Sequence, residues 1–202
     1  MSKLNIKNIH KYFEKKSKYY DNIKNSLLFI LIKKKELNIF LQNVKINSDD
    51  KIIDLASGSG FYINEIKKSK PREIYAVDFS KKMLDKIKFQ KVIKINADIQ
   101  NLNLNKKFDK IFCFGLLEFC EKINIIFKKI SNLSGSRSEI YIIFPRKNIF
   151  GFIYKFHHLL YGLSIKIRSF KFIENELKKN NLIIVKKYNT FLSTFVILRK
   201  NG

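Results

Sequence analysis

From residue 51 onward, short runs rich in isoleucine, valine and aromatic residues alternate with segments in which apolar residues recur at helical spacing. Strands that alternate with helices favour one mainly parallel sheet, which helices cover on both faces. A run such as IYIIF, which is apolar at every position, fits a strand that is buried on both sides. The expected strands occupy residues 51–56, 73–78, 91–98, 108–115 and 139–145.

The C-terminal part of the chain departs from this alternation. After an expected helix in FKFIENELKKNN, the runs LIIVKKY and TFVILRK are separated only by the few residues from Asn189 to Ser193. That connection is too short for a crossover helix, so the two runs should pair as an antiparallel hairpin. The prediction is therefore an α/β, Rossmann-like fold: a seven-stranded, mainly parallel sheet with an antiparallel last strand and helices on both faces.

The 202 residues suit one domain with a sizeable core. We divide it into an N-terminal helical cap (1–45), a cofactor-binding core (50–145), a substrate lid insertion (146–169) and a C-terminal helix and β-hairpin (170–200). The longest apolar runs fall far below the roughly 20 residues that a membrane span needs, and there is no signal-peptide pattern. We expect a cytoplasmic protein, with a peripheral membrane contact left open.

The formal net charge of +24 invites a nucleic-acid interpretation. However, only five of the 41 basic residues are arginine, the residue that nucleic-acid sites favour for its bidentate geometry. The excess of Lys, Asn and Ile is spread evenly along the chain, as a genome-wide codon bias would spread it. We therefore do not expect nucleic acid as the main partner, although RNA and anionic membrane surfaces remain alternatives.

Polar or flexible residues follow three consecutive expected strands, at the end of a parallel sheet where ligands bind. The first strand leads into DLASGSG, whose glycines permit close backbone approach and which precedes a helix N-terminus. The second strand ends at Asp78, which could accept hydrogen bonds from ribose, and the third ends at Asp98, which could accept from an adenine amine. Each feature alone could be a tight turn or a helix cap. Together they indicate a nucleoside pocket.

The spacing Asp-x-Ala-x-Gly-x-Gly differs from the dinucleotide fingerprint GxGxxG. Asp54 places a negative charge where a pyrophosphate would be repelled. A ligand with an amino group and no phosphate fits better, which describes S-adenosylmethionine.

Four segments resemble, in order, the motifs of class I S-adenosylmethionine-dependent methyltransferases of the small-molecule methyltransferase-11 or -25 type. They are IIDLASGSG, VDFSKKML, NADIQNL and FDKIFCFGLLEF. The resemblance covers roughly residues 50 to 200, and SFKFIENELKKNNLIIV is similar to the late helix and following strand of the family. Two departures are Ala56, where glycine is usual, and SNLSGSR, where relatives often carry a Pro-Gly-Gly turn.

The resemblance implies that the first loop holds the methionine part of the cofactor, Asp78 the ribose, and Asp98 with Ile99 the adenine. Ala56 should need a negative φ, because alanine is strained at positive φ. The cofactor-binding residues implied are Asp54, Ala56, Ser57, Gly58, Gly60, Asp78, Phe79, Met83, Asp98, Ile99, Phe114 and Gly115.

The acceptor should bind between the N-terminal helices and the lid segment NIFGFIYKFHHLLYGLSIKI. An apolar lid suggests a small lipophilic or aromatic acceptor, reached in one interpretation at a membrane surface. The candidate catalytic residues are His157, His158 and Tyr20, each of which could instead be structural. No Cys/His cluster indicates a metal site.

Two other functions remain as alternatives. An RNA methyltransferase would suit the charge, but Phe114 to Leu117 stand where base-amino enzymes usually carry an Asn/Asp-Pro-Pro-aromatic tetrad, and Cys113 is not preceded by proline. A non-catalytic Rossmann-like binding protein would account for Ala56 and for the missing Pro-Gly-Gly turn.

Overall fold

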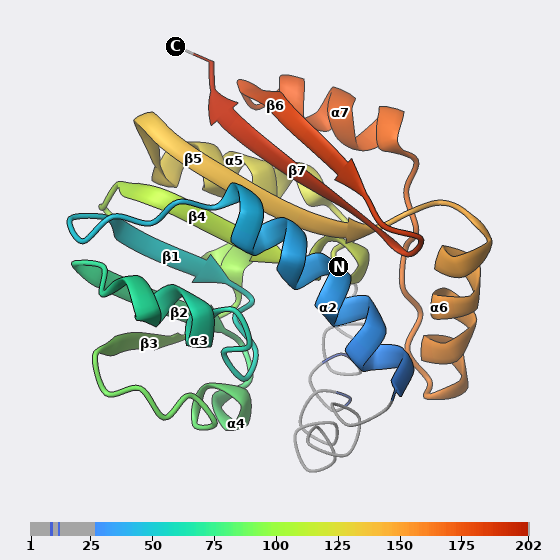
Figure 1. Ribbon diagram of the computed structural model, residues 1–202. Helices are drawn as coiled ribbons and strands as arrows, with labels where there is room; N and C mark the ends of the chain where they lie inside the picture. Colours follow the sequence, from blue (N-terminus) through green and yellow to red (C-terminus); the bar gives the residue numbers. More distant parts are fainter. Residues whose placement is uncertain (1–8, 10–11, 13–26, 202) are drawn as a thin grey trace.

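The computed structural model describes Ile9, Tyr12 and residues 27–201, and its centre is a seven-stranded sheet (Figure 1). The strand order is β3-β2-β1-β4-β5-β7-β6. The strands are β1 (Lys51–Leu55), β2 (Glu73–Asp78), β3 (Val92–Asn96), β4 (Phe108–Phe114), β5 (Ser134–Pro145), β6 (Leu182–Asn189) and β7 (Ser193–Lys200).

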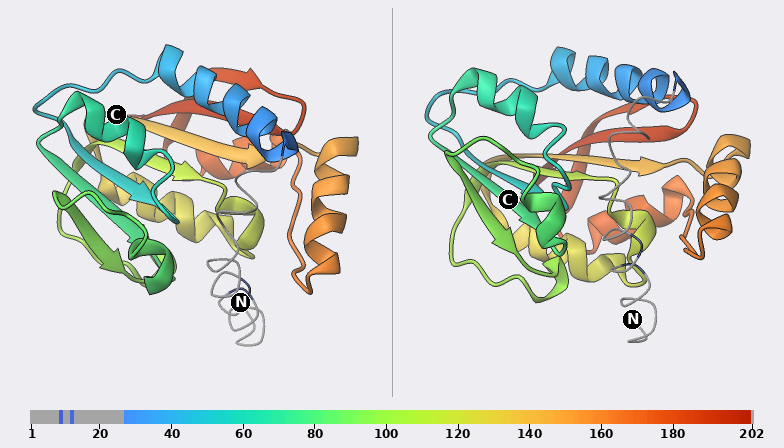
Figure 2. Two further views of the ribbon diagram at one scale, coloured as in Figure 1. Left: turned by 60° about the horizontal axis from the view of Figure 1, so that its bottom comes forward. Right: turned by 90° about the horizontal axis from the view of Figure 1, so that it is seen from below.

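Helices α2 and α3 cover one face of the sheet, and α5 and α7 cover the other (Figures 1 and 2). Helix α6 lies beyond the end of β5 instead of on a face. The helices are α2 (Leu27–Asn43), α3 (Ile63–Ile66), α4 (Lys81–Leu84), α5 (Ile123–Leu133), α6 (Ile149–Leu160) and α7 (Phe170–Lys178), with short 3-10 helices η1 (Lys67–Ser69), η2 (Ile99–Asn101) and η3 (Leu117–Phe119).

The pairing of the strands confirms the predicted fold. Strands β1 to β5 pair in parallel, whereas β7 is antiparallel to both β5 and β6. The hairpin between β6 and β7 forms across the short connection that the sequence indicates. The carboxyl ends of β1 to β5 therefore share one edge of the sheet.

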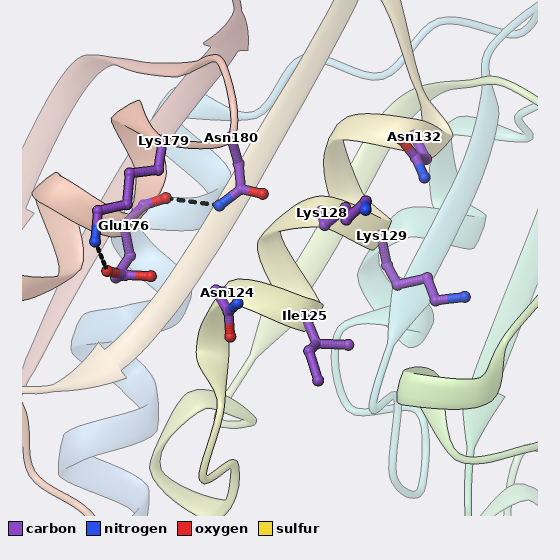
Figure 3. A pocket seen from close by; sticks show the side chains of 8 residues that line it. All are labelled: Asn124, Ile125, Lys128, Lys129, Asn132, Glu176, Lys179 and Asn180. Carbon is purple, nitrogen blue, oxygen red and sulfur yellow. Dashed lines mark hydrogen bonds and ion pairs between the residues drawn. The ribbon is translucent and has the colours of Figure 1, made fainter.

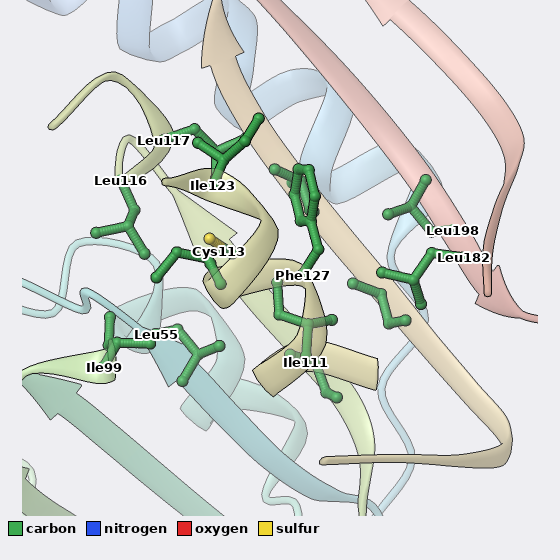
Figure 4. Close-up of a cluster of buried hydrophobic side chains, with 14 of the residues drawn as sticks. Leu55, Ile99, Ile111, Cys113, Leu116, Leu117, Ile123, Phe127, Leu182 and Leu198 are labelled. Carbon is green, nitrogen blue, oxygen red and sulfur yellow. The ribbon is translucent and has the colours of Figure 1, made fainter. Parts of the chain in front are cut away.

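Consecutive residues of the central strands point to opposite faces and bury into two separate cores. Ile53 belongs to the core under α5 and α7, whereas its neighbour Ile52 belongs to the core under α2 and α3. In β5 the alternation continues through Ile140, Tyr141 and Ile142, all of which are buried. Figure 4 shows the first of these cores. Burial of alternate residues in the two cores explains why IYIIF is apolar at every position.

The SNLSGSR segment shows how the sheet forms without a Pro-Gly-Gly turn. Helix α5 passes directly into β5 at Ser134, five residues before the strand start expected from the sequence, and the pairing with β4 shifts between Phe108 and Lys110. The Ser138 hydroxyl closes this irregularity: it donates to the Phe108 carbonyl at 2.5 Å and accepts from the Gly135 amide at 2.7 Å. The departure from the family pattern thus leaves the sheet intact.

Candidate active site

The first loop is held against the end of β2 by the Asp78 carboxylate. The Gly58 amide donates to Asp78 Oδ2 at 2.8 Å, and the Ser80 amide donates to Oδ1 at 2.9 Å. The Ser57 amide donates to the Val77 carbonyl at 3.0 Å. Residues that are separated by about twenty positions in the sequence therefore form one small, ordered polar site, in which Asp78 is largely buried.

Asp54 lies at the same sheet edge and is only 3% exposed. Burial, with a smaller contribution from the negative charge of Asp78, raises the pKa of the Asp54 carboxyl from its ordinary 3.8 to about 8. At neutral pH this carboxyl is therefore mostly protonated in the free protein, and a nearby cation would favour its ionised form. This chemistry fits a ligand with an amino group.

Ala56 corrects the expectation of a negative φ, because its φ is +63°. Gly58 and Gly60 in the same loop also have positive φ, at +53° and +78°. A Cβ in this region costs roughly 1–2 kcal/mol, which glycine avoids. The loop therefore keeps its left-handed turn despite the alanine, at a cost in conformational energy.

Replacing Ala56 by glycine should stabilise the fold. We expect a gain of about 0.5–1 kcal/mol, because relief of the left-handed strain exceeds the extra chain entropy of glycine. The matched contrast is Gly58→Ala, which meets no atom within 4 Å and should lose a similar amount through φ alone. Urea unfolding of both variants measures the effect. A lower free energy of unfolding in Ala56→Gly would contradict the strain argument.

Asp98 caps η2, since its Oδ1 accepts from the Gln100 amide at 2.9 Å. The capping alternative is therefore realised for Asp98, whereas the cap of α4 is Ser80 and not Asp78. Asn96 joins β3 to the end of β2 by donating to the Asp78 and Phe79 carbonyls at 3.1 and 2.8 Å.

The apolar residues implied at the cofactor site have different environments. Met83 and Ile99 are buried. Phe79 packs against a cluster of Ile9, Leu163 and Ile165, so it faces the segment that follows the lid helix. Phe114 contacts the Tyr62 ring, with centroids 4.5 Å apart, and precedes Gly115.

Glu118 is a candidate site residue that the sequence reasoning missed. It lies in η3, directly after β4, and its Oε1 is 3.8 Å from the position that a Cβ on Gly115 would occupy. Oε1 accepts from the Tyr154 hydroxyl at 3.4 Å, whereas Oε2 has no hydrogen-bond partner among the described residues. Burial raises the pKa of Glu118 to about 7. The sequence feature that could have identified Glu118 is the presence of an acidic residue in the otherwise apolar run LLEFC.

The two histidines of the lid lie in different places. His158 is buried, its Nδ1 is 3.0 Å from the Tyr154 carbonyl, and its ring lies 4.3 Å from the Tyr154 ring and 5.8 Å from that of Tyr12. His157 is exposed and packs on Tyr161. The structure thus brings His158, but not His157, to the Glu118 side of the sheet. Tyr20 lies outside the described residues.

The chain after α6 returns along η3 and fixes it. The Lys166 amide donates to the Glu118 carbonyl at 2.8 Å. The Arg168 guanidinium donates to three carbonyls, those of Leu117, Cys120 and Glu121. These bonds hold the backbone that carries the Glu118 carboxyl.

Helix α6 forms where the lid was expected, but its apolar side chains do not line the site. Among its residues only Gly151 and His158 are buried, and most of its large apolar side chains are exposed to solvent. A hollow of about 600 Å³ between α5 and α7 also lies elsewhere (Figure 3). It is lined mainly by polar and charged residues of these helices, and it includes none of the expected site residues.

The fold is the Rossmann-like fold of class I methyltransferases. Residues 53–140 match the family model described as a methyltransferase domain, Methyltransf_11. The chain is 32% identical over 110 residues to the methyltransferase-like protein 235L of Invertebrate iridescent virus 6. That match spans 52% of this chain but only 40% of the viral protein.

Solved structures share the whole fold at low sequence identity. Magnesium protoporphyrin IX methyltransferase from Synechocystis PCC 6803, with bound SAH, superposes with a TM-score of 0.76 at 14% identity, over 96% of this chain and 98% of that one. The DhpI–SAM–HEP complex superposes with a TM-score of 0.79 at 12% identity, over 98% and 99% of the two chains. These structures confirm the predicted fold, and the match of residues 53–140 to the methyltransferase-domain model confirms the predicted resemblance.

Proposed function

We propose that this chain transfers a methyl group from S-adenosylmethionine to a small lipophilic or aromatic acceptor. The observation that carries the proposal is the presence of two buried carboxyl groups at one edge of the sheet: Asp54 near the end of β1, and Glu118 beside Gly115 after β4. The first suits the amino group of the cofactor. The second can accept the proton that the nucleophile of the acceptor must lose.

The residues of the first loop and of the next two strand ends would hold the cofactor. Asp54 and the backbone of Gly58 and Gly60 would receive the methionine part. The Asp78 carboxylate, which accepts from the Gly58 and Ser80 amides, would accept from a ribose hydroxyl, since a carboxylate can accept several hydrogen bonds. The carboxylate of Asp98 would accept from adenine, with Ile99, Met83 and Phe79 nearby.

When bound, S-adenosylmethionine would supply an electrophilic methyl group on a sulfonium, whose sulfur would keep the electron pair of the sulfur–methyl bond as the acceptor takes the methyl group. The chain contributes alignment of the nucleophile with the methyl group. Glu118 takes the proton of an acceptor hydroxyl or amine as the new bond forms. Tyr12, Tyr154 and His158 form an aromatic cluster beside Glu118, and this cluster supports an aromatic acceptor.

Replacing Asp78 by alanine should abolish cofactor binding. The change removes the carboxylate that orders the first loop and the proposed ribose contact, so we expect the dissociation constant to rise at least about 100-fold, as for loss of a charged hydrogen-bonding group. Equilibrium binding of labelled S-adenosylmethionine measures this. Asp85→Asn, an exposed carboxylate on the following segment, is the control.

No binding by the wild-type chain at hundreds of micromolar cofactor would contradict the enzyme proposal and would favour the non-catalytic alternative. Binding that persists unchanged in Asp78→Ala would contradict the ribose assignment alone. The acceptor itself is found by a mass-shift screen, in which cell extract is incubated with the cofactor, with and without the protein.

RNA is the second candidate acceptor, because of the net charge of +24. Specific affinity for RNA that falls steeply with salt would favour it. The small-molecule proposal expects only weak binding without preference among sequences.

A further inference from the structure

Helix α6 presents a large apolar surface that the rest of the described chain does not cover. Ile149, Ile153, Phe156 and Leu160 follow helical spacing along one side and are 58–68% exposed. Phe152 and Leu159 flank them at 49% and 54%. We call these six residues the α6 patch. Exposed apolar patches of this extent are typical of surfaces that bind a partner or a membrane.

The surroundings of the patch are basic. Between Glu139 and Glu174 the sequence has no Asp or Glu but has six Lys and Arg. Lys147 precedes α6, and Lys155 lies on the helix; both are exposed. Lys35 of α2 is also near this helix, since its Nζ lies 5.1 Å from the centroid of the Phe191 ring, which in turn packs on Phe150 of α6 at 5.3 Å. The patch therefore has cationic neighbours from two elements.

We propose that α6 docks the chain on an anionic phospholipid surface, with the helix lying in the plane of the interface. Apolar side chains would enter the boundary between headgroups and acyl chains, and the lysines would contact lipid phosphates. Charge complementarity favours lipid over a second copy of the chain, because a second copy would bring the same positive charges against the patch. The helix has 12 residues, and no described helix is long and apolar enough to cross a bilayer.

Docking in this way would place the bilayer beside the acceptor side of the sheet. The exposed side of α6 is the patch, and its buried side carries His158 next to Tyr154, whose hydroxyl bonds to Glu118. A lipophilic molecule could then move from the membrane to the site without crossing bulk water. The docking itself does not depend on the proposed methyl transfer, and its test needs no activity.

The test is flotation of the full chain with vesicles of phosphatidylcholine alone or of phosphatidylcholine mixed with phosphatidylglycerol. We expect binding only to the anionic vesicles. The variant Ile153→Asp/Phe156→Asp should lower the partition coefficient at least about tenfold, because charged groups replace inserted apolar ones. The control is Leu41→Asp/Phe172→Asp, which makes the same charge change at exposed apolar residues of α2 and α7. It should bind nearly as wild type.

A second pair of variants tests the charge. Lys147→Gln/Lys155→Gln should lower binding to anionic vesicles about tenfold, whereas Lys91→Gln/Lys94→Gln, on and beside the edge strand β3, should lower it less. Absence of wild-type binding at low salt would overturn the proposal. So would equal binding by Ile153→Asp/Phe156→Asp, or a concentration-dependent dimer that this variant abolishes while vesicle binding is absent.

Discussion

Asp54→Asn is expected to stabilise the free protein and to weaken S-adenosylmethionine binding at the same time. The carboxyl is buried, and its pKa is raised to about 8 by burial and by Asp78. An amide of nearly the same shape needs no proton to stay neutral, so it removes the free-energy cost of keeping this carboxyl protonated in the folded chain above about pH 4. It also removes the charge-assisted contact with the cofactor amine, and we expect the dissociation constant to rise about 10- to 100-fold.

The sign of the pH dependence follows from the raised pKa. In the unfolded chain Asp54 ionises near pH 3.8, whereas in the folded chain it keeps its proton until about pH 8. The folded state therefore loses stability relative to the unfolded state as the pH rises from about 4 to 8. Asp54→Asn should match the wild type near pH 4 and exceed it by on the order of 5 kcal/mol at pH 8.

Chemical unfolding at several pH values and calorimetric titration with the cofactor measure the two effects. Asp85→Asn is the matched control, because Asp85 is an exposed carboxylate whose loss should change neither quantity much. Loss of stability in Asp54→Asn at pH 8 would contradict the buried-charge argument. Unchanged cofactor affinity would contradict its assigned contact while leaving the stability argument in place.

Cofactor binding should also release protons. At pH 7 most of the free protein holds Asp54 protonated, and the cofactor ammonium favours the ionised form. Close to one proton should therefore leave on binding, and affinity should rise with pH toward about 8. Titrations in buffers of different ionisation enthalpy measure the released proton. Asp54→Asn should release none.

The strands were predictable because their chemistry is local. Each expected strand is found, and β2 has the expected bounds. The two-sided burial of β5 follows from an unbroken apolar run between helices. The start of β5 at Ser134 was not predictable, because it depends on the hydrogen bond of Ser138 to Phe108, thirty residues away.

The site was predictable only in part, for the same reason. Asp78 and Asp54 follow from their positions at strand ends, but the φ of Ala56 depends on how the loop closes on Asp78 through Gly58. The environment of Glu118 was not predictable, because it depends on contacts with Tyr154 of α6 and with the segment that follows α6. Helical spacing predicts that α6 has an apolar side. Whether that side faces the core or the solvent depends on the rest of the fold.

Glu118→Gln is expected to lower kcat by about 10²- to 10³-fold while leaving cofactor affinity nearly unchanged, which is the range for loss of a general base. Glutamine keeps the shape and can still accept from the Tyr154 hydroxyl, so the loss reports on proton transfer and not on packing. Glu121→Gln is the matched control. It lies in the same segment but forms an exposed ion pair with Lys166, and it should keep nearly full activity.

The pH profile separates a base from a merely structural carboxyl. Glu118 must be ionised to accept the proton, and its pKa in the free protein is raised to about 7, so kcat/KM should rise with pH through about 7. The profile of kcat/KM should carry a second rise near 8, because the free protein must also ionise Asp54 to bind the cofactor. In Glu118→Gln the first rise should vanish and the second should remain. A wild-type kcat/KM without a rise near 7, or a variant that keeps this rise, would remove Glu118 from proton transfer and leave alignment as the chain's contribution.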